Sequence, residues 1–141
     1  MVQAEGAKLA AIPMTAHEVS HIVITAAMKV HSTLGPGLLE SAYEACLAHE
    51  LRKVGLKVET QVGLPVVYDG IKLDLGYRID MLVNGLVVVE LKSVEEISRI
   101  HVAQVLSYMK LSKKQLGLII NFNVLRLKDG IKRLVEGTGW K

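Results

Sequence analysis

The sequence predicts an α/β fold with the element order α-α-β-β-β-α-β and a short β hairpin at the end. Apolar residues recur at helical spacing over about residues 16–33 and 38–54. Strand-like runs separated by Asp-Gly and Asn-Gly turns follow. A third helical run and one more apolar strand complete the order.

Composition predicts a single domain. The chain has 141 residues, of which 50% are hydrophobic and 22% charged, enough to bury a real core. We expect residues 15–141 to form this domain and residues 1–14 to be a flexible N-terminus without the features of a signal peptide. Cys46 is the single cysteine, so the chain has no internal disulfide, and we expect a cytoplasmic location. No apolar run is long enough for a membrane span, and no membrane partner is expected.

Charge mildly favours an anionic partner such as nucleic acid. The formal net charge is +3 and the pI about 9.0. An ordinary solvated basic surface explains this balance equally well. Four Tyr, one Trp and one Phe are too few for an extended base-stacking platform, so contacts to the phosphate backbone would dominate.

Capping and turn residues set the element boundaries. Thr15 can cap the first helix, Gly35-Pro36-Gly37 ends it, and Gly55 ends the second. The predicted later elements are strands 57–68, 71–83 and 86–93 with turns at 69–70 and 84–85, a helix at 97–111, a strand at 116–121 and a hairpin across Asp129-Gly130.

Charged side chains gather on the hairpin of the second and third predicted strands. Asp80 lies on the second strand, and Glu90 and Lys92 share one face of the third, in VVVELKS (87–93). Carboxylates on neighbouring strands are ligands that Mg²⁺ or Mn²⁺ prefers, and a lysine beside them can orient an attacking water. This pattern predicts metal-dependent phosphodiester hydrolysis. A salt bridge of Glu90 with Lys92, or of Asp80 with Arg78, is the structural alternative, and on the hairpin alone it is the more frequent outcome.

The second predicted helix places an acid on its apolar face. Glu40 falls between Tyr43 and Leu51 on that face, and a buried carboxylate needs a cation or several donors. Glu50 shares the face and Glu44 lies at its border, so one of these acids could be a paired structural charge. Glu40 is preferred because it lies near the start of the helix.

The third predicted helix repeats the pattern. Gln104 and Tyr108 lie four residues apart on its apolar face, where they could hydrogen-bond a phosphate, a water or a metal ligand. Satisfying a backbone group is the structural alternative. His101 beside them is given no catalytic role.

Together these residues resemble a known family. GLLESAY (37–43) matches the motif of the GxxExxY proteins, and Asp80 followed by ELK (90–92) is similar to the signature of the PD-(D/E)XK nuclease superfamily. Gln104 and Tyr108 resemble the QxxxY element of its RecB-like branch. The resemblance covers about residues 17–136.

The resemblance implies a restriction-endonuclease-like fold, in which helices flank a mixed central sheet. It implies that Asp80 and Glu90 hold Mg²⁺ or Mn²⁺, that Leu91 adds its backbone carbonyl, and that Lys92 serves the water. Ile79 occupies the position where the signature has proline. This departure matters little, because the acid that follows it, Asp80, carries the chemistry. The resemblance also implies that Glu40 is an accessory acid and a further candidate metal ligand. Gln104, Tyr108 and Tyr43 would support the site.

The loop at Asn84-Gly85 decides whether the two acids meet. In a two-residue loop, Asp80 and Glu90 would point to opposite faces of the sheet. A three-residue loop (83–85) with Gly85 left-handed places Asp80 opposite Val88, on the side of Glu90. We predict this loop, or a bulge with equal effect.

These observations predict a metal-dependent nuclease, with DNA favoured over RNA as its substrate. The main alternative is a non-catalytic nucleic-acid-binding or protein-interaction module on the same fold. A sugar hydrolase using Glu40 and Glu90 is a weaker alternative, because the chain lacks an aromatic sugar platform. Because a domain this small offers little surface for recognition, a homodimer or a protein partner is a further hypothesis.

Overall fold

The computed structural model describes residues 14–136. The predicted flexible N-terminus therefore lies, apart from Met14, outside the described residues. The described helices are α2 (Ala16–Leu34), α3 (Glu40–Lys53), α4 (Arg99–Ser112) and the short 3₁₀ helix η1 (Leu127–Gly130). The strands are β1 (Val58–Gly63), β2 (Val66–Tyr68), β3 (Ile71–Leu73), β4 (Arg78–Val83), β5 (Val87–Lys92), β6 (Leu116–Asn121) and β7 (Ile131–Val135).

Local signals define the helix ends much as predicted. Thr15 and Glu18 form a capping box at the start of α2, each side chain binding the other residue's backbone N–H. Ser98 caps α4 in the same way with His101, whose ring thereby serves the helix start. After α3, the chain turns at Gly55 with a φ of 90°, a conformation that glycine adopts readily.

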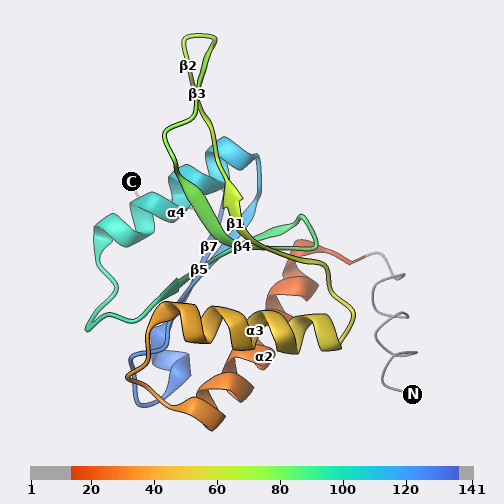
Figure 1. The fold of residues 1–141 in the computed structure, drawn as a ribbon, viewed down its shortest axis with the longest axis vertical. Helices are drawn as coiled ribbons and strands as arrows, with labels where there is room; N and C mark the ends of the chain where they lie inside the picture. The colour runs from red at the N-terminus through yellow and green to blue at the C-terminus, as the bar shows by residue number, and fades with distance from the viewer. Residues whose placement is uncertain (1–13, 137–141) are drawn as a thin grey trace.

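The central sheet has five strands in the order β1-β4-β5-β6-β7. β5 and β6 are parallel and the other three pairings are antiparallel. α4 connects the parallel pair, because parallel neighbours need a crossover. The structure confirms the predicted restriction-endonuclease-like architecture, a mixed sheet flanked by helices (Figure 1).

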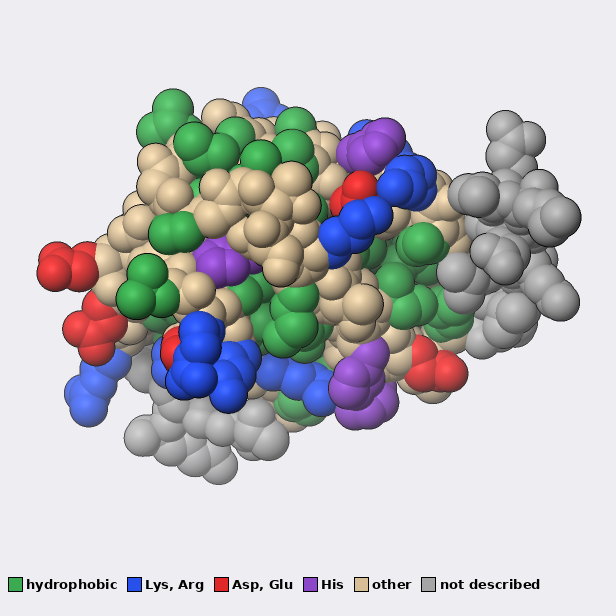
Figure 2. Space-filling model, turned by 90° about the horizontal axis from the view of Figure 1, so that it is seen from below, with side chains coloured by type: hydrophobic (Ala, Val, Ile, Leu, Met, Phe, Trp, Pro, Cys, Tyr) green, Lys and Arg blue, Asp and Glu red, His purple; other side chains and the backbone are tan. Residues whose placement is uncertain are grey.

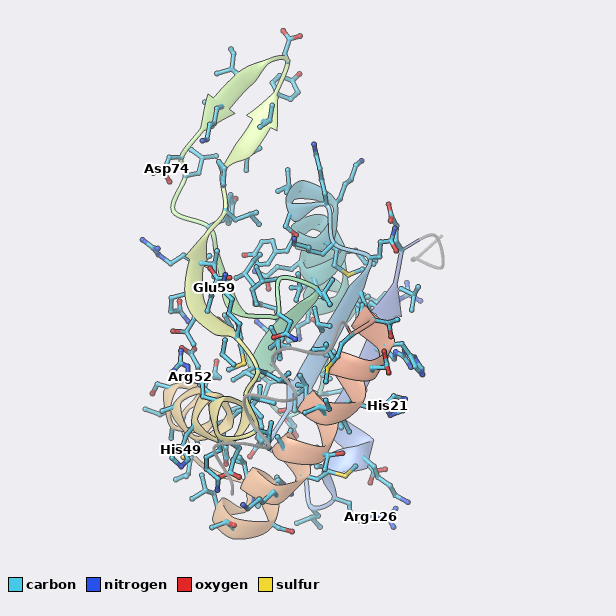
Figure 3. The ribbon with its side chains drawn as sticks, turned by 90° about the vertical axis from the view of Figure 1, so that its right-hand side faces the viewer. His21, His49, Arg52, Glu59, Asp74 and Arg126 are labelled. Atoms are coloured by element: carbon cyan, nitrogen blue, oxygen red, sulfur yellow. The ribbon has the colours of Figure 1, made fainter. Side chains whose placement is uncertain are left out.

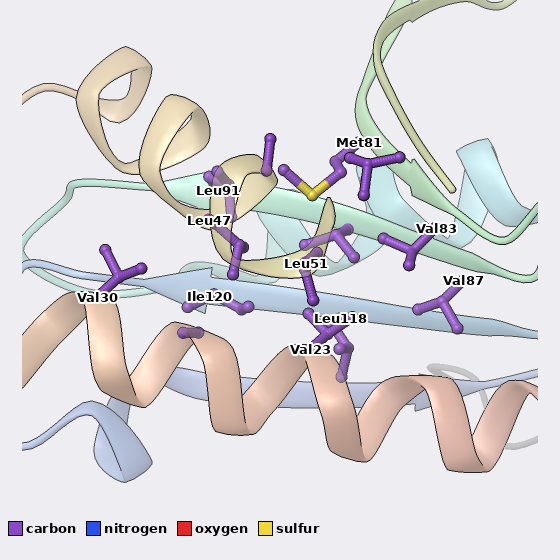
Figure 4. Close-up of a cluster of buried hydrophobic side chains, with 14 of the residues drawn as sticks. Val23, Val30, Leu47, Leu51, Met81, Val83, Val87, Leu91, Leu118 and Ile120 are labelled. Carbon is purple, nitrogen blue, oxygen red and sulfur yellow. The ribbon is translucent and has the colours of Figure 1, made fainter. Parts of the chain in front are cut away.

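Helices cover both faces of this sheet. α2 and α3 pack with one face, where the valines, leucines and isoleucines of β4, β5 and β6 form the larger core cluster (Figure 4). Tyr43 of α3 stacks on Phe122 in this cluster, with ring centroids 4.2 Å apart. α4 covers the other face and approaches β6 closely, because a Cβ at Gly117 would lie 2.7 Å from the sulfur of Met109.

Two predicted strand features are wrong in detail. Asp129-Gly130 does not turn a hairpin: these residues belong to η1, Leu127 is buried in the core, and β7 pairs with β6 instead. The two long predicted strands before residue 84 are each interrupted. Their outer parts, β2 and β3, form a separate hairpin that projects from the body (Figure 1).

No helix within residues 14–136 is long and apolar enough to cross a membrane.

Candidate active site

The two predicted acids meet where β4 and β5 separate. The β4–β5 ladder runs from Val83 opposite Val87 to Met81 opposite Val89, so the next position sets Asp80 opposite Glu90. The expected proximity of the two acids is observed, because Glu90 Oε2 lies 2.7 Å from the backbone nitrogen of Asp80. The predicted partner of Asp80, Val88, is wrong, because the register is displaced.

The loop explains this displacement. Asn84 and Gly85 both have left-handed backbones, with φ of 53° and 63°, and the N–H of Leu86 closes their turn on the carbonyl of Val83. Because Val83 pairs with Val87, Leu86 is an extra residue, as in a β-bulge. The loop therefore comprises residues 84–86 rather than 83–85.

Carboxylates replace the strand-to-strand hydrogen bonds at this point. Glu90 Oε2 accepts the backbone N–H of Asp80 at 2.7 Å, and Asp80 Oδ2 accepts the N–H of Leu91 at 2.9 Å. β4 also changes face here, since Met81 packs in the α2–α3 cluster and Ile79 in the α4 cluster. Residues two apart on a regular strand share a face, so the strand twists at Asp80.

Glu90 is the most perturbed acid of the site. Its side chain is buried, with 3% of the residue exposed. Burial, and then the neighbouring charge of Asp80, raise the pKa of Glu90 to about 8, and Glu44 adds a smaller effect in the same direction. The N–H of Asp80 and the charge of Lys92 lower this pKa, but they do not offset the burial.

The predicted salt bridges are absent from the described part of the chain. No lysine or arginine nitrogen lies within 4.0 Å of a carboxylate oxygen of Asp80 or Glu90 among residues 14–136. Lys92 Nζ instead donates to Gln104 Oε1 at 3.4 Å. The described part of the chain thus offers the paired acids no cation within bonding distance.

A polar chain on α4 extends from Lys92. Gln104 Nε2 donates to the hydroxyl of Tyr108 at 3.2 Å, so Gln104 binds both neighbours. Tyr108 is buried, and this burial followed by the charge of Glu90 raises the pKa of its phenol. The phenol therefore stays protonated in the neutral pH range.

Gln61 and Glu44 lie at the site although the sequence argument did not select them. Gln61 Nε2 donates to Glu44 Oε2 at 2.8 Å and to Asp80 Oδ1 at 3.4 Å, so its amide links the acid of α3 to that of β4. The β1–β4 register skips the pair of Gln61 and Asp80, and Gln61 has a φ of 52°. A non-glycine residue in this region is strained, a feature that concentrates at functional sites. In the sequence, only its position as a polar residue in the middle of a predicted strand could have marked Gln61 as a site residue.

Two residues of α3 differ from expectation. Glu40 is the first residue of the helix and is exposed, so its predicted burial is wrong. Its backbone region adjoins the end of β5, because Ser93 Oγ donates to the carbonyl of Leu38 at 2.7 Å. Tyr43 is buried and its hydroxyl binds the loop rather than either acid: it donates to the carbonyl of Gly35 at 2.6 Å and accepts the N–H of Leu38. Tyr43 thus holds the α2–α3 loop.

The donor set suits a hard divalent cation. Asp80 and Glu90 supply carboxylate oxygens, the ligand type that Mg²⁺ and Mn²⁺ prefer. Among residues 14–136, no group of three or more His, Cys, Asp or Glu side chains forms a metal-ligating cluster. One or two carboxylates completed by water and substrate oxygens are typical of Mg²⁺ sites, so the residues fit the cation.

The comparison with known families agrees with this geometry. The profile described as the PD-(D/E)XK nuclease superfamily matches residues 17–134, a span that contains every residue of the candidate site. No curated protein and no solved structure matches the chain. Since the matched span is well over half of the chain, the protein belongs to the PD-(D/E)XK nuclease superfamily.

Proposed function

We propose that this protein is a nuclease that hydrolyses phosphodiester bonds of DNA with Mg²⁺ or Mn²⁺ as its cofactor. One observation carries the proposal: buried Glu90 lies beside Asp80 with no lysine or arginine within 4.0 Å of either among the described residues. A buried carboxylate next to a second carboxylate requires a cation or a proton. Membership of a superfamily associated with metal-dependent cleavage of nucleic acids supports the cation.

Asp80 and Glu90 would hold the metal, with the backbone carbonyl of Leu91 as a third ligand. The N–H of Leu91 points to Asp80, and in a strand the carbonyl of a residue lies on the same side as its own N–H. A metal bound there polarises the scissile phosphate and lowers the pKa of a water.

Lys92 would orient the attacking water and offset the charge that develops on the phosphorus oxygens. Its contact with Gln104 supports this role, because the amide holds the ammonium without neutralising it. Gln104 is in turn bound to Tyr108, so both residues of α4 act as positioning residues for Lys92.

Two acids of α3 are candidates for the accessory acid. Glu40 remains the candidate suggested by the family motif, and the contact of Leu38 with Ser93 places its helix turn near the end of β5. Glu44 is favoured by a direct link through Gln61 to Asp80. Comparing Glu40→Gln with Glu44→Gln separates them, since the accessory acid is the one whose loss lowers the cleavage rate at saturating metal.

Within the superfamily, we assign the chain to the GxxExxY proteins and their RecB-like branch. The motif residues Gly37, Glu40 and Tyr43 support the first assignment. The hydrogen bond between Gln104 and Tyr108 supports the second, because it joins the two defining residues of the QxxxY element.

The rival function is a non-catalytic nucleic-acid-binding module. Such a module relies on a continuous basic surface for phosphate contacts. On the face shown in Figure 2, lysine and arginine side chains form separate groups among neutral and apolar ones. On the face in view, the described residues therefore form no continuous basic surface of that kind.

A cleavage panel tests the proposal. Labelled single-stranded DNA, duplex DNA, branched DNA and RNA are each incubated with Mg²⁺, Mn²⁺ or EDTA. We expect cleavage that needs the metal and is lost in Asp80→Asn and Lys92→Ala. Matched controls are Asp129→Asn and Lys57→Ala, which alter exposed ion-paired residues that are not among the proposed ligands or positioning residues and should cut normally.

The outcomes distinguish the functions. Cutting of RNA alone would refute the DNA assignment. Equal cutting by wild type and both site variants would show that the activity belongs to a contaminant. Nucleic-acid binding without metal binding or cutting would establish the non-catalytic module.

A further inference from the structure

The projecting hairpin, residues 66–73, stands clear of the rest of the protein. Among residues 14–136, β2 and β3 pair only with each other, and every residue from 67 to 78 is exposed. Figures 1 and 3 show both strands extending beyond the sheet and helices, and Asp74 marks the base of the hairpin in Figure 3. An isolated two-stranded hairpin is only marginally stable in water, so packing against a partner would stabilise this one.

One face of the projecting hairpin is apolar. Val66 pairs with Leu73 and Tyr68 with Ile71, and alternation along the strands puts these four side chains on one face. Tyr68 is 73% and Ile71 57% exposed. The opposite face carries Val67 and Lys72. This division is typical of a sheet with one covered face, yet the described part of the chain leaves the apolar face uncovered.

The charges around this face disfavour nucleic acid as its partner. The apolar face has no cation, and the charges around it balance: Asp69 at the tip and Asp74 at the base stand against Lys72 on the reverse face and Arg78 at the start of β4. Phosphate contacts need lysine or arginine, and acids near them repel the backbone. The chain as a whole is basic, with a net charge of +3, so the hairpin is a nearly neutral island on a basic protein.

The apolar face of the hairpin is suited to bind the same face of a second copy of the chain. A two-fold contact sets a patch against its own image, so any charged side chain at its centre would face a like charge. The apolar face has no charged side chain, and its only near charges lie at the tip, the base and the reverse face. Lys72 also protects the β3 edge from further strand addition, which favours a closed pair over a growing sheet.

We propose that this protein forms a homodimer by packing the apolar faces of two projecting hairpins against each other. Tyr68 and Ile71 form the centre of the contact. Sheets that pack face to face lie about 10 Å apart, close enough for these side chains to interdigitate. The hairpin leaves the body between β1 and β4, the strands of Gln61 and Asp80, so dimerisation brings two candidate active sites into one particle.

Sedimentation velocity on the full-length chain tests the dimer. A small apolar contact of this kind falls in the weak interface class, so the protein is measured from about 1 to about 200 µM. We expect the mass to rise with concentration from that of the 15.4 kDa chain towards twice that value. A constant monomer mass over the whole range would overturn the proposal.

Two matched substitutions locate the contact. Ile71→Lys puts a charge on the apolar face and should raise the dimer dissociation constant by at least roughly tenfold. Val67→Lys makes the same kind of change at an equally exposed site on the reverse face and should alter the constant less than about twofold. Circular dichroism melts check folding, which neither exposed substitution should change.

Three results would refute the assigned surface. The first is an intact dimer in Ile71→Lys, and the second is equal dissociation in both variants. The third is a monomer whose duplex-DNA binding is weakened by the neutral substitution Tyr68→Ala, which would make the hairpin a nucleic-acid contact. These experiments measure mass and DNA binding, so their outcome does not depend on whether the protein is a nuclease.

Discussion

The carboxylate of Glu90 accepts the backbone N–H of Asp80 at 2.7 Å, at the position where the β4–β5 ladder would otherwise continue. The two acids are therefore part of the sheet's own hydrogen bonding. This contact fixes one Glu90 oxygen and leaves the other free to bind a cation. Removing either acid should disturb both the metal site and the strand end.

Metal binding should release protons. The pKa of Glu90 is about 8 in the metal-free protein, so the group is largely protonated at pH 7 and must ionise to bind a cation. We expect the affinity for Mn²⁺ to rise about tenfold per pH unit below pH 8. Isothermal titration calorimetry in buffers of different ionisation enthalpy measures the protons released. A pH-independent affinity with no proton release would contradict this assignment.

The metal-free protein should lose stability as pH rises. The pKa of Glu90 is raised from 4.5 in the unfolded chain to about 8 in the folded one. Its contribution is therefore fully present below pH 4.5 and is lost between pH 4.5 and 8, by an amount on the order of 4 kcal/mol. Urea unfolding in EDTA at pH 5 and pH 8 measures this loss.

The control for this prediction is Glu90→Gln, which has no proton to lose. Relative to wild type, its free energy of unfolding should fall less from pH 5 to pH 8, because all other titrating groups are shared. Glu59→Gln, at an exposed acid paired with Lys57 3.7 Å away, should behave as wild type. Equal pH slopes in all three proteins would rule out Glu90 as the titrating group.

Lys92 and Gln104 should differ in what they contribute. Lys92→Ala removes the ammonium itself and should lower the cleavage rate by about 10²- to 10³-fold. Gln104→Ala keeps the ammonium of Lys92 but removes the amide that holds it, and should lower the cleavage rate about tenfold. Metal affinity measured by calorimetry should change little in either variant, since neither residue is a ligand. A larger loss for Gln104→Ala than for Lys92→Ala would reverse the assigned roles.

Gln61 combines a strained backbone with a bridge between two acids. Both Gln61→Gly and Gln61→Ala remove the amide and should weaken Mn²⁺ binding by a similar factor. Only glycine relieves the left-handed backbone, so Gln61→Gly should be about 1 kcal/mol more stable than Gln61→Ala. Chemical unfolding and calorimetry measure the two effects separately. Unchanged metal binding in both variants would show that the bridge is not needed.

The sequence by itself determined the elements that depend on short-range signals. Thr15 and Gly55 mark helix ends through capping and backbone freedom, and β6 coincides with its predicted range, 116–121. Asp80, Glu90 and Lys92 could also be selected, because their spacing follows the strand period and because together they resemble a family signature. The helix ends and β6 need only neighbouring residues, so local propensity and periodicity suffice to predict them, whereas the choice of the three charged residues also needed the resemblance.

Only the tertiary structure decided which charged groups meet. The extra residue Leu86 shifts the register so that Asp80 lies opposite Glu90, and this depends on a turn closed between strands. The link from Gln61 to Glu44 joins segments that periodicity treats separately, and the helix pattern favoured Glu40 instead. Burial likewise depends on how α4 and the sheet pack, which is why the raised pKa of Glu90 follows from the fold and not from its neighbours in the chain.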